Sequence, residues 1–142
     1  MGIQTFFYPS GFLNRTAVMP YTNIWEPRGL HRMFSGEVSG DEIFESNLEL
    51  HTDIRFKGIQ YIINDFSGVT DHSIDLGHTE VYASTDKIIS KTKHTLAIAL
   101  VVPQAHFFDL AKNYCDLMRG QTFECNIFQT VEDARSWISK SE

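Results

Sequence analysis

LAIALVV, residues 96–102, is the stretch that decides the fold class. It holds no polar residue, and a short apolar run of this kind is typical of a strand covered on both faces. Pro103 ends the run. The apolar residues that follow recur at the spacing of one helical face, at Phe107, Leu110, Ala111, Tyr114 and Leu117. A buried strand that leads directly into an amphipathic helix indicates a parallel sheet covered by helices.

The same alternation continues on both sides of this stretch. Upstream, GIQYIIND at 58–65 is a second, almost continuous apolar strand, and we expect a helix from about Ser73 to Ile89 behind it. Downstream, FECNIFQ at 123–129 alternates as a strand, and Thr130 is placed to cap a last helix.

The beginning of the domain is predicted to be a hairpin followed by a helix. A turn at 27–29 joins two strands, and the second runs from about His31 to Val38. Ser39 and Glu42 form the S-x-x-E capping box that opens a helix. Its inner side is expected to carry Ile43, Phe44, Leu48 and Ile54.

Strands and helices that alternate at these lengths predict an α/β fold. We expect a mixed, mostly parallel sheet of four or five strands with about four helices packed against it. A chain of 142 residues has the size of one domain. We place this domain at 22–142. Residues 1–21 form an N-terminal extension that is too apolar for a free tail, so we expect it to pack on the domain or on a second subunit, as in a homodimer.

Composition and charge argue against several classes of function. A net charge of −6 gives no basic footprint, so we expect no nucleic-acid partner. Proline and glycine interrupt the first residues before a long apolar segment accumulates, which predicts no signal peptide, no stable membrane insertion and a cytoplasmic location. Cys115 and Cys125 lack zinc-site spacing and are expected to be buried reduced thiols. The six histidines form no H-x-x-x-H or HExxH pair, so neither a metal nor a cofactor is expected.

The order of elements and four segments carry a resemblance to a known family. The segments are FSGEVSGDEIFE, IQYIINDFSGVT, LAIALVV and FECNIFQTVEDARSWI. In the order β-β-α-β-α-β-α-β-α, they resemble the STAS fold of anti-sigma factor antagonists. The closer resemblance is to the SpoIIAA-like group, also called STAS/SEC14 domain proteins, and it covers about residues 22–140.

The resemblance implies a regulatory role. Anti-sigma factor antagonists bind a partner kinase or sigma regulator and are switched by phosphorylation of a serine or threonine in a D-S-x-G segment that opens a helix. The corresponding stretch here is GVTDHSIDLG, where His72 follows Asp71 and Ile74 stands at the phosphorylated position. The switch therefore does not carry over directly.

Polar residues collect where the predicted strands end. In a parallel sheet, ligands bind beyond the carboxyl ends of the strands, near helix N-termini that favour anions. This rule selects a set of binding or switch candidates, which we call the rim candidates. They are Asp65, Ser67, Asp71, His72, Ser73, Gln104, His106 and Thr130.

Several rim candidates also have an ordinary structural explanation. Asp65 can accept hydrogen bonds from loop N–H groups, and Ser67 precedes a glycine in a turn signal. Asp71 and Ser73 are good N-caps for the following helix, and capping is the more frequent role of such residues. A phosphate on Ser73 would be stabilised by that helix N-terminus and repelled by Asp71 and Asp75.

We therefore predict a non-enzymatic regulatory or ligand-binding module that acts through the rim candidates on an unidentified protein partner or a small apolar ligand. The alternative is a carrier of a hydrophobic small molecule or lipid. This carrier hypothesis rests on the number of aromatic residues in the chain, and aromatic residues form part of a hydrophobic core more often than they line a binding pocket. A serine hydrolase is the weakest hypothesis, because Ser67 is not in a G-x-S-x-G elbow and His72 and Ser73 are adjacent. Phe107 and Phe108 cannot both face inward on one helix, so one of them is expected at the surface.

Overall fold

The elements follow one another in the predicted order. The structure is a computed structural model that describes residues 20–93 and 95–141. The elements are β1 (Tyr21–Glu26), β2 (Gly29–Ser39), α1 (Gly40–Thr52), a 3-10 helix η2 (Ile54–Gly58), β3 (Tyr61–Ser73), α2 (Leu76–Ser90), β4 (Leu96–Val101), α3 (Ala105–Leu117), β5 (Phe123–Phe128) and α4 (Val131–Ser141). Most of the predicted extension at 1–21 lies outside the described residues.

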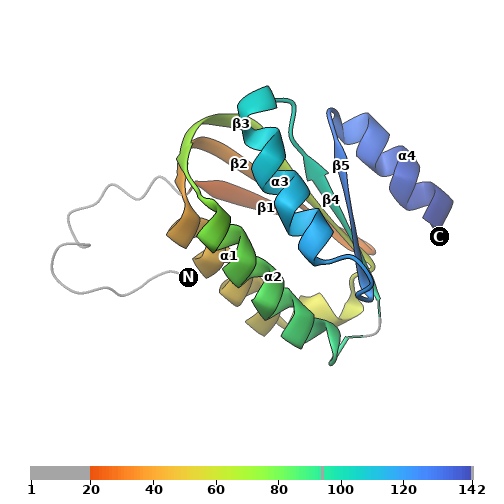
Figure 1. Ribbon diagram of the computed structural model, residues 1–142. Helices are drawn as coiled ribbons and strands as arrows, with labels where there is room; N and C mark the ends of the chain where they lie inside the picture. The colour runs from red at the N-terminus through yellow and green to blue at the C-terminus, as the bar shows by residue number, and fades with distance from the viewer. Residues whose placement is uncertain (1–19, 94, 142) are drawn as a thin grey trace, which may run out of the picture.

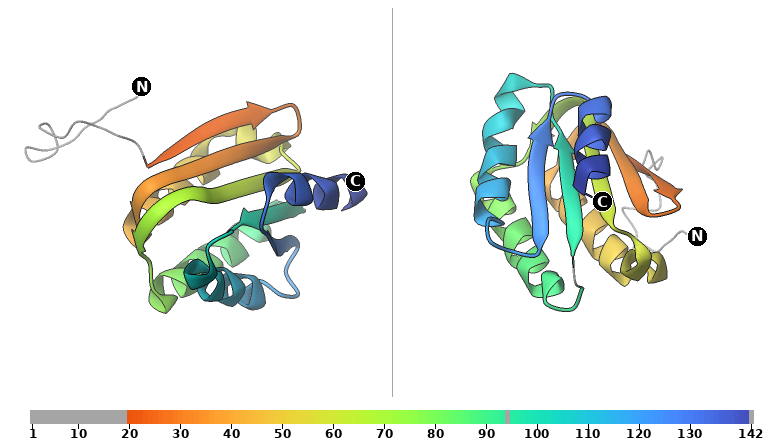
Figure 2. Two further views of the ribbon diagram at one scale, coloured as in Figure 1. Left: turned by 90° about the horizontal axis from the view of Figure 1, so that it is seen from above. Right: turned by 90° about the vertical axis from the view of Figure 1, so that its right-hand side faces the viewer.

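The described residues form one five-stranded sheet in the order β1-β2-β3-β4-β5. β1 is antiparallel to β2, and β2, β3, β4 and β5 are parallel to their neighbours. Each crossover moves one strand in the same direction, and right-handed crossovers then place α1, α2 and α3 on the same face. α4 follows the last strand and packs on the opposite face (Figures 1 and 2). The predicted α/β class with a mixed, mostly parallel sheet is confirmed.

β3 is much longer than the apolar run that predicted it. It pairs with β4 only from Tyr61 to Asp65, where Asp65 lies opposite Val101. Beyond that point it continues to Ser73 and pairs with β2 alone. Two register shifts between β2 and β3, each with one extra residue in β3, interrupt the pairing of this two-stranded ribbon. Gly36 of β2 has a φ of 71°, which favours glycine.

The predicted start of α2 was wrong. Asp71 and Ser73 belong to β3, and the N-cap is Asp75. The Asp75 side chain accepts a hydrogen bond from the N–H of His78, and the His78 ring accepts one from the N–H of Asp75. The extra pairing with β2 keeps residues 68–73 in an extended strand. The helix therefore begins after Asp75, and not after Asp71 or Ser73 as the sequence suggested. The capping boxes at Ser39 and Asp75, and the Thr130 cap of α4, use side chains as expected of such residues.

Replacing Asp75 by alanine should lower the free energy of unfolding by about 1 kcal/mol, because the first turn of α2 loses its cap. Asp71→Ala is the matched control, since Asp71 is an exposed strand residue outside the helix, and it should change this free energy by less than about 0.5 kcal/mol. Urea unfolding of both variants measures the difference. Equal losses of stability in the two variants would contradict Asp75 as the N-cap of α2.

The inner face of α1 also differs from its prediction. Ile43 and Leu50 are buried, but Leu48 is 44% exposed and Ile54 is 88% exposed. Ile54 lies in η2, outside the register of α1, and Phe56 takes the core position there. The helical period places Ser46 inward, where a polar residue was not expected.

α4 closes the second face of the sheet. Ala134 and Ile138 pack on Ile63, Ala99 and their neighbours to form a small second core. Arg135 makes a bidentate ion pair with Glu26 at the end of β1, at 2.7 and 3.0 Å. The helix is thus joined to the hairpin at the other end of the chain.

The expectation of reduced thiols was wrong. Cys115 of α3 and Cys125 of β5 are joined by a disulfide. The two residues are ten apart, and the Met118–Gln121 turn between the elements brings them together. Disulfides are common in oxidising compartments and rare in the cytosol. A cytoplasmic location thus stays a prediction.

In 20–93 and 95–141, no helix is both long enough and apolar enough to span a membrane.

Candidate functional site

The first rim candidates form a hydrogen-bonded cluster on the α4 face of the sheet. Both the N–H and the hydroxyl of Ser67 donate to Oδ1 of Asp65, and Oδ2 of Asp65 lies 3.1 Å from Nε2 of His31. Burial acts to raise the pKa of Asp65, but these hydrogen bonds outweigh it and hold that pKa below its usual value. The carboxylate accepts hydrogen bonds from the backbone and the side chain of a residue two positions ahead, which lies in β3 and not in a loop as expected.

This cluster lacks the geometry of a serine nucleophile. A catalytic serine needs a base that takes its proton, and that base is normally a histidine held by a carboxylate. Here the Ser67 hydroxyl donates to Asp65, and His31 lies on the other side of that carboxylate. We therefore do not take the hydrolase hypothesis further.

A second group of rim candidates packs around the start of α3. The amide of Gln104 donates to the carbonyl groups of Phe66 and Val69, at 2.8 and 3.0 Å, and ties α3 to the ribbon. The ring of His72 stacks on Phe107 at 4.5 Å and lies parallel to the ring of His106 at 5.9 Å. Phe107 is buried and Phe108 is 42% exposed, which confirms that only one of the pair faces inward.

The remaining rim candidates are not gathered with these. Asp71 and Ser73 are exposed on the ribbon, eight residues or fewer beyond Asp65. At about 3.3 Å per strand residue, Ser73 lies up to roughly 26 Å from Asp65 along the chain. The Thr130 hydroxyl caps α4 beyond the end of β5, two strands away from Asp65. The structure thus divides the rim candidates among several places instead of building one pocket from them.

A cavity lies between the sheet and helices α1, α2 and α3. Its volume is about 80 Å³. Most of its lining is apolar and comes from the main core, including Phe34, Ile62, Leu100 and Phe107. One side is polar, and we call that side the polar wall. The polar wall consists of Arg32, Asn47, His51, Asn64, Asp86 and Tyr114.

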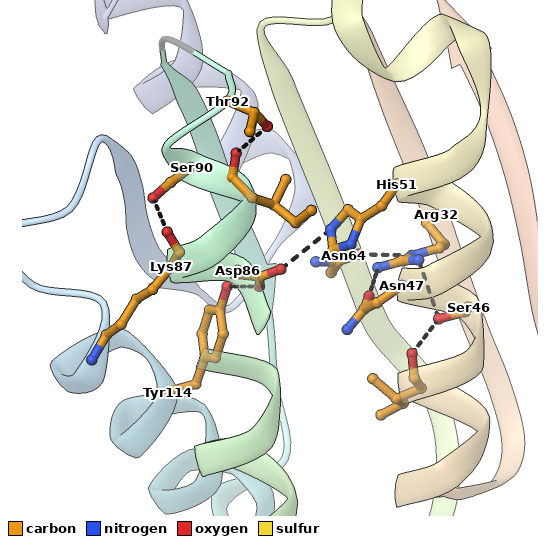
Figure 3. A network of polar contacts seen from close by, with 12 residues as sticks. Arg32, Ser46, Asn47, His51, Asn64, Asp86, Lys87, Ser90, Thr92 and Tyr114 are labelled. Carbon is orange, nitrogen blue, oxygen red and sulfur yellow. Dashed lines mark hydrogen bonds and ion pairs between the residues drawn. The ribbon is translucent and has the colours of Figure 1, made fainter. Parts of the chain in front are cut away.

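Arg32 is the most unusual residue of the polar wall. It is 2% exposed and points from β2 toward α1, where its guanidinium donates to Asn64, Ser46 and Asn47 at 3.0, 3.1 and 2.7 Å (Figure 3). All three acceptors are neutral, and Arg32 makes no ion pair within the described ranges 20–93 and 95–141. Burial lowers the pKa of Arg32 to about 10, against the opposing charge of Asp86, so the side chain remains a cation at neutral pH.

Asp86 joins three helices at the other side of the polar wall. Its Oδ2 accepts a hydrogen bond from the Tyr114 hydroxyl of α3, and its Oδ1 lies 3.3 Å from Nε2 of His51 on α1 (Figure 3). Burial first, and then Asp86, raises the pKa of Tyr114 well above its ordinary value, which keeps this phenol neutral. The His51 side chain is only 8% exposed. Within the described residues its Nδ1 is buried and has no hydrogen-bond partner.

The polar wall can recognise a small ligand. A guanidinium has five N–H groups in a planar fork that suits carboxylates, and the three bonds of Arg32 leave two of them for another acceptor. Buried polar atoms are almost always hydrogen-bonded, so a hydrogen-bond partner is expected for Nδ1 of His51 as well. No group of three or more metal-ligating side chains is found in the part of the chain that the structure describes.

Sequence reasoning missed this site because its residues are scattered over three helices and two strands. A signal does exist in the period of each element. Arg32 stands between Leu30 and Phe34 on the inward face of a strand, and Asn64 between Ile62 and Phe66 on the next. On α2, Asp86 follows Thr79, Tyr82 and Ala83 on the buried stripe. Polar residues at positions that the period assigns to the core mark the polar wall.

Comparison with known proteins adds no assignment. No protein-family model matches the chain. The searches of curated proteins and of solved structures found no significant match either. The function is therefore inferred from the geometry of this chain.

Proposed function

We propose that the protein is a non-enzymatic binding module that holds a small organic anion in the cavity beside Arg32. The observation that carries this proposal is a fully buried guanidinium on the wall of an apolar cavity, with only neutral acceptors around it. Removing a cation from water is costly unless a charge compensates it. Asp86 contributes part of this compensation, and an anionic ligand would contribute more.

The size and lining of the cavity define the ligand further. A cavity of about 150 Å³ holds a benzene molecule. By the same measure, a space of about 80 Å³ suits roughly three non-hydrogen atoms. A short-chain carboxylate has a carbon chain of this size, a head that matches the guanidinium fork and a tail that matches the apolar lining. A lipid of ordinary length does not fit, so the proposal keeps the small-molecule part of the carrier hypothesis.

The order of elements also supports the proposal that the fold is STAS-like, of the SpoIIAA-like group. One antiparallel hairpin strand, a run of parallel strands with helices between them and a closing helix agree with the predicted order. Sequential crossovers in one direction leave no point where the strand order reverses, which is where open α/β sheets usually form a ligand crevice. This topology favours a site under the helices over a site at the rim.

The test is isothermal titration calorimetry with two ligands of equal size, propionate and propanamide. Propionate should bind and propanamide should bind at least tenfold more weakly, because a charged carboxylate accepts a stronger hydrogen bond from the guanidinium than a neutral amide does. Arg32→Met should abolish propionate binding. Arg55→Met is the matched control, because Arg55 is an exposed arginine that stacks on Trp25 outside the cavity, and it should bind as the wild type does. Equal binding of both ligands, or propionate binding that survives Arg32→Met, would contradict the proposal.

A second candidate function is docking of a protein partner at the start of α3. The stacked rings of His72 and His106 and the exposed Phe108 favour it, since exposed aromatic residues mark contact surfaces. Phosphorylation of Ser73 has less support, because the carboxylate of Asp75 already caps the helix that would stabilise a phosphate. Mass spectrometry of the protein after incubation in cell extract tests for a phosphopeptide that contains Ser73.

A further inference from the structure

Two opposite charges line the cavity beside His51. Arg32 of β2 is a cation, Asp86 of α2 is an anion, and Tyr114 of α3 is a neutral phenol. β3 contributes the neutral amide of Asn64, and η2 contributes Phe56, whose ring lies edge-on to His51 at 5.2 Å. Lys93 approaches the same Phe56 ring, and its amine donates to the carbonyl groups of Lys57 and Ile59. Lys93 lies outside the cavity lining, as does Glu49, whose charge acts on Arg32, so the lining itself carries one positive and one negative charge.

An anionic ligand would upset this balance. A carboxylate that pairs directly with Arg32 leaves Asp86 without that cation, so the lining then carries two negative charges and one positive charge. An uncompensated buried charge weakens the binding of a small ligand. Binding of a monoanion thus calls for one additional positive charge near the cavity.

His51 is the group that can supply this charge. Imidazole is the side chain that takes up a proton most readily near neutral pH. The contact between Nε2 of His51 and Asp86 directs the Nε2 proton to that carboxylate, which leaves a lone pair on the unpartnered Nδ1. Asp86 is the less suitable acceptor, because the Tyr114 hydroxyl and Nε2 of His51 already occupy its two carboxylate oxygens.

Building on the proposed function, we infer that a small monocarboxylate enters the cavity together with one proton, which binds to Nδ1 of His51. The proton comes from the solvent. The imidazolium then donates from Nδ1 to the ligand and from Nε2 to Asp86, while Arg32 donates to the same ligand carboxylate. Release of the ligand returns the proton, so that ligand binding and pH are linked through one residue.

Calorimetry of propionate binding in buffers of different ionisation enthalpy measures the proton uptake directly. We expect about one proton taken up per propionate where His51 is neutral in the free protein, and a roughly tenfold weaker affinity for each unit of rising pH in that range. Propanamide should bind without proton uptake. In the ¹⁵N spectrum of the histidine rings, His51 should change from a neutral to a doubly protonated ring as propionate is added.

His51→Gln supplies the decisive variant, because its amide can still donate to Asp86 but cannot take up a proton. Proton uptake should vanish, and the affinity for propionate near pH 6 should fall at least tenfold. His106→Gln is the matched control, since His106 is exposed and outside the cavity, and it should retain both. Propionate binding without proton uptake, or uptake that persists in His51→Gln, would overturn the inference and leave the proposed function standing. No propionate binding at all would overturn both.

Discussion

Arg32→Met is expected to lower the free energy of unfolding by about 3 to 5 kcal/mol, the largest single effect that the structure predicts. The side chain is buried, and its removal takes the hydrogen-bond donor from Asn64, Ser46 and Asn47 at once. It also leaves the buried Asp86 without the cation that balances it. A methionine fills most of the volume, so the loss reports the missing charge and donors more than a cavity. Urea unfolding measures the change.

Arg55→Met separates this effect from the general loss of an arginine. Arg55 is exposed, pairs with Asp53 two residues away and stacks on Trp25 at 4.1 Å. An exposed pair of this kind contributes little to stability. An Arg32→Met variant as stable as Arg55→Met would show that the polar wall does not depend on its cation.

Reduction of the Cys115–Cys125 disulfide is expected to lower the free energy of unfolding by about 3 kcal/mol. The bond closes a loop between residues ten apart, and a loop of this size restricts the unfolded chain by roughly that amount. It also fastens the end of α3 to the edge strand β5, which has a neighbouring strand on one side only. Urea unfolding of the wild type with and without a reductant measures the difference.

The Cys115→Ser, Cys125→Ser double variant is the control for this experiment. It should be as unstable as the reduced wild type and should not respond to the reductant. Two titratable thiols in the protein as isolated, or a wild type that is indifferent to the reductant, would contradict the disulfide and return the cysteines to the reduced state that the sequence suggested.

The fold was accessible from the sequence because its signals are local. The apolar run at 96–102 and the helical stripe behind it each lie in one segment, and β4 and α3 follow them closely. The Ser39 capping box likewise marks the start of α1 to the residue. The end of β3 was not accessible, because its last eight residues are held extended by pairing with β2, a contact over some thirty-four residues of chain.

The candidate site was not accessible in the same way. The rule that selected the rim candidates applies to a sheet with a reversal in strand order, and the order of this sheet is sequential. Arg32, His51 and Asp86 meet only after three crossovers have stacked their elements. The sequence does show polar residues on inward-facing positions. Which of them meet at one cavity depends on the register between strands, and that register is a tertiary property.

The most direct test of the proposed binding site is a nuclear Overhauser measurement between ¹³C-labelled propionate and the methyl groups of the protein. We predict contacts from the ligand methyl group to Ile62, Leu100 and Ala111, which line the cavity beside the polar wall. These contacts should disappear in Arg32→Met. Contacts to the rim near His72 and His106 instead, or none to any cavity methyl group at saturating propionate, would contradict a ligand site beneath the helices.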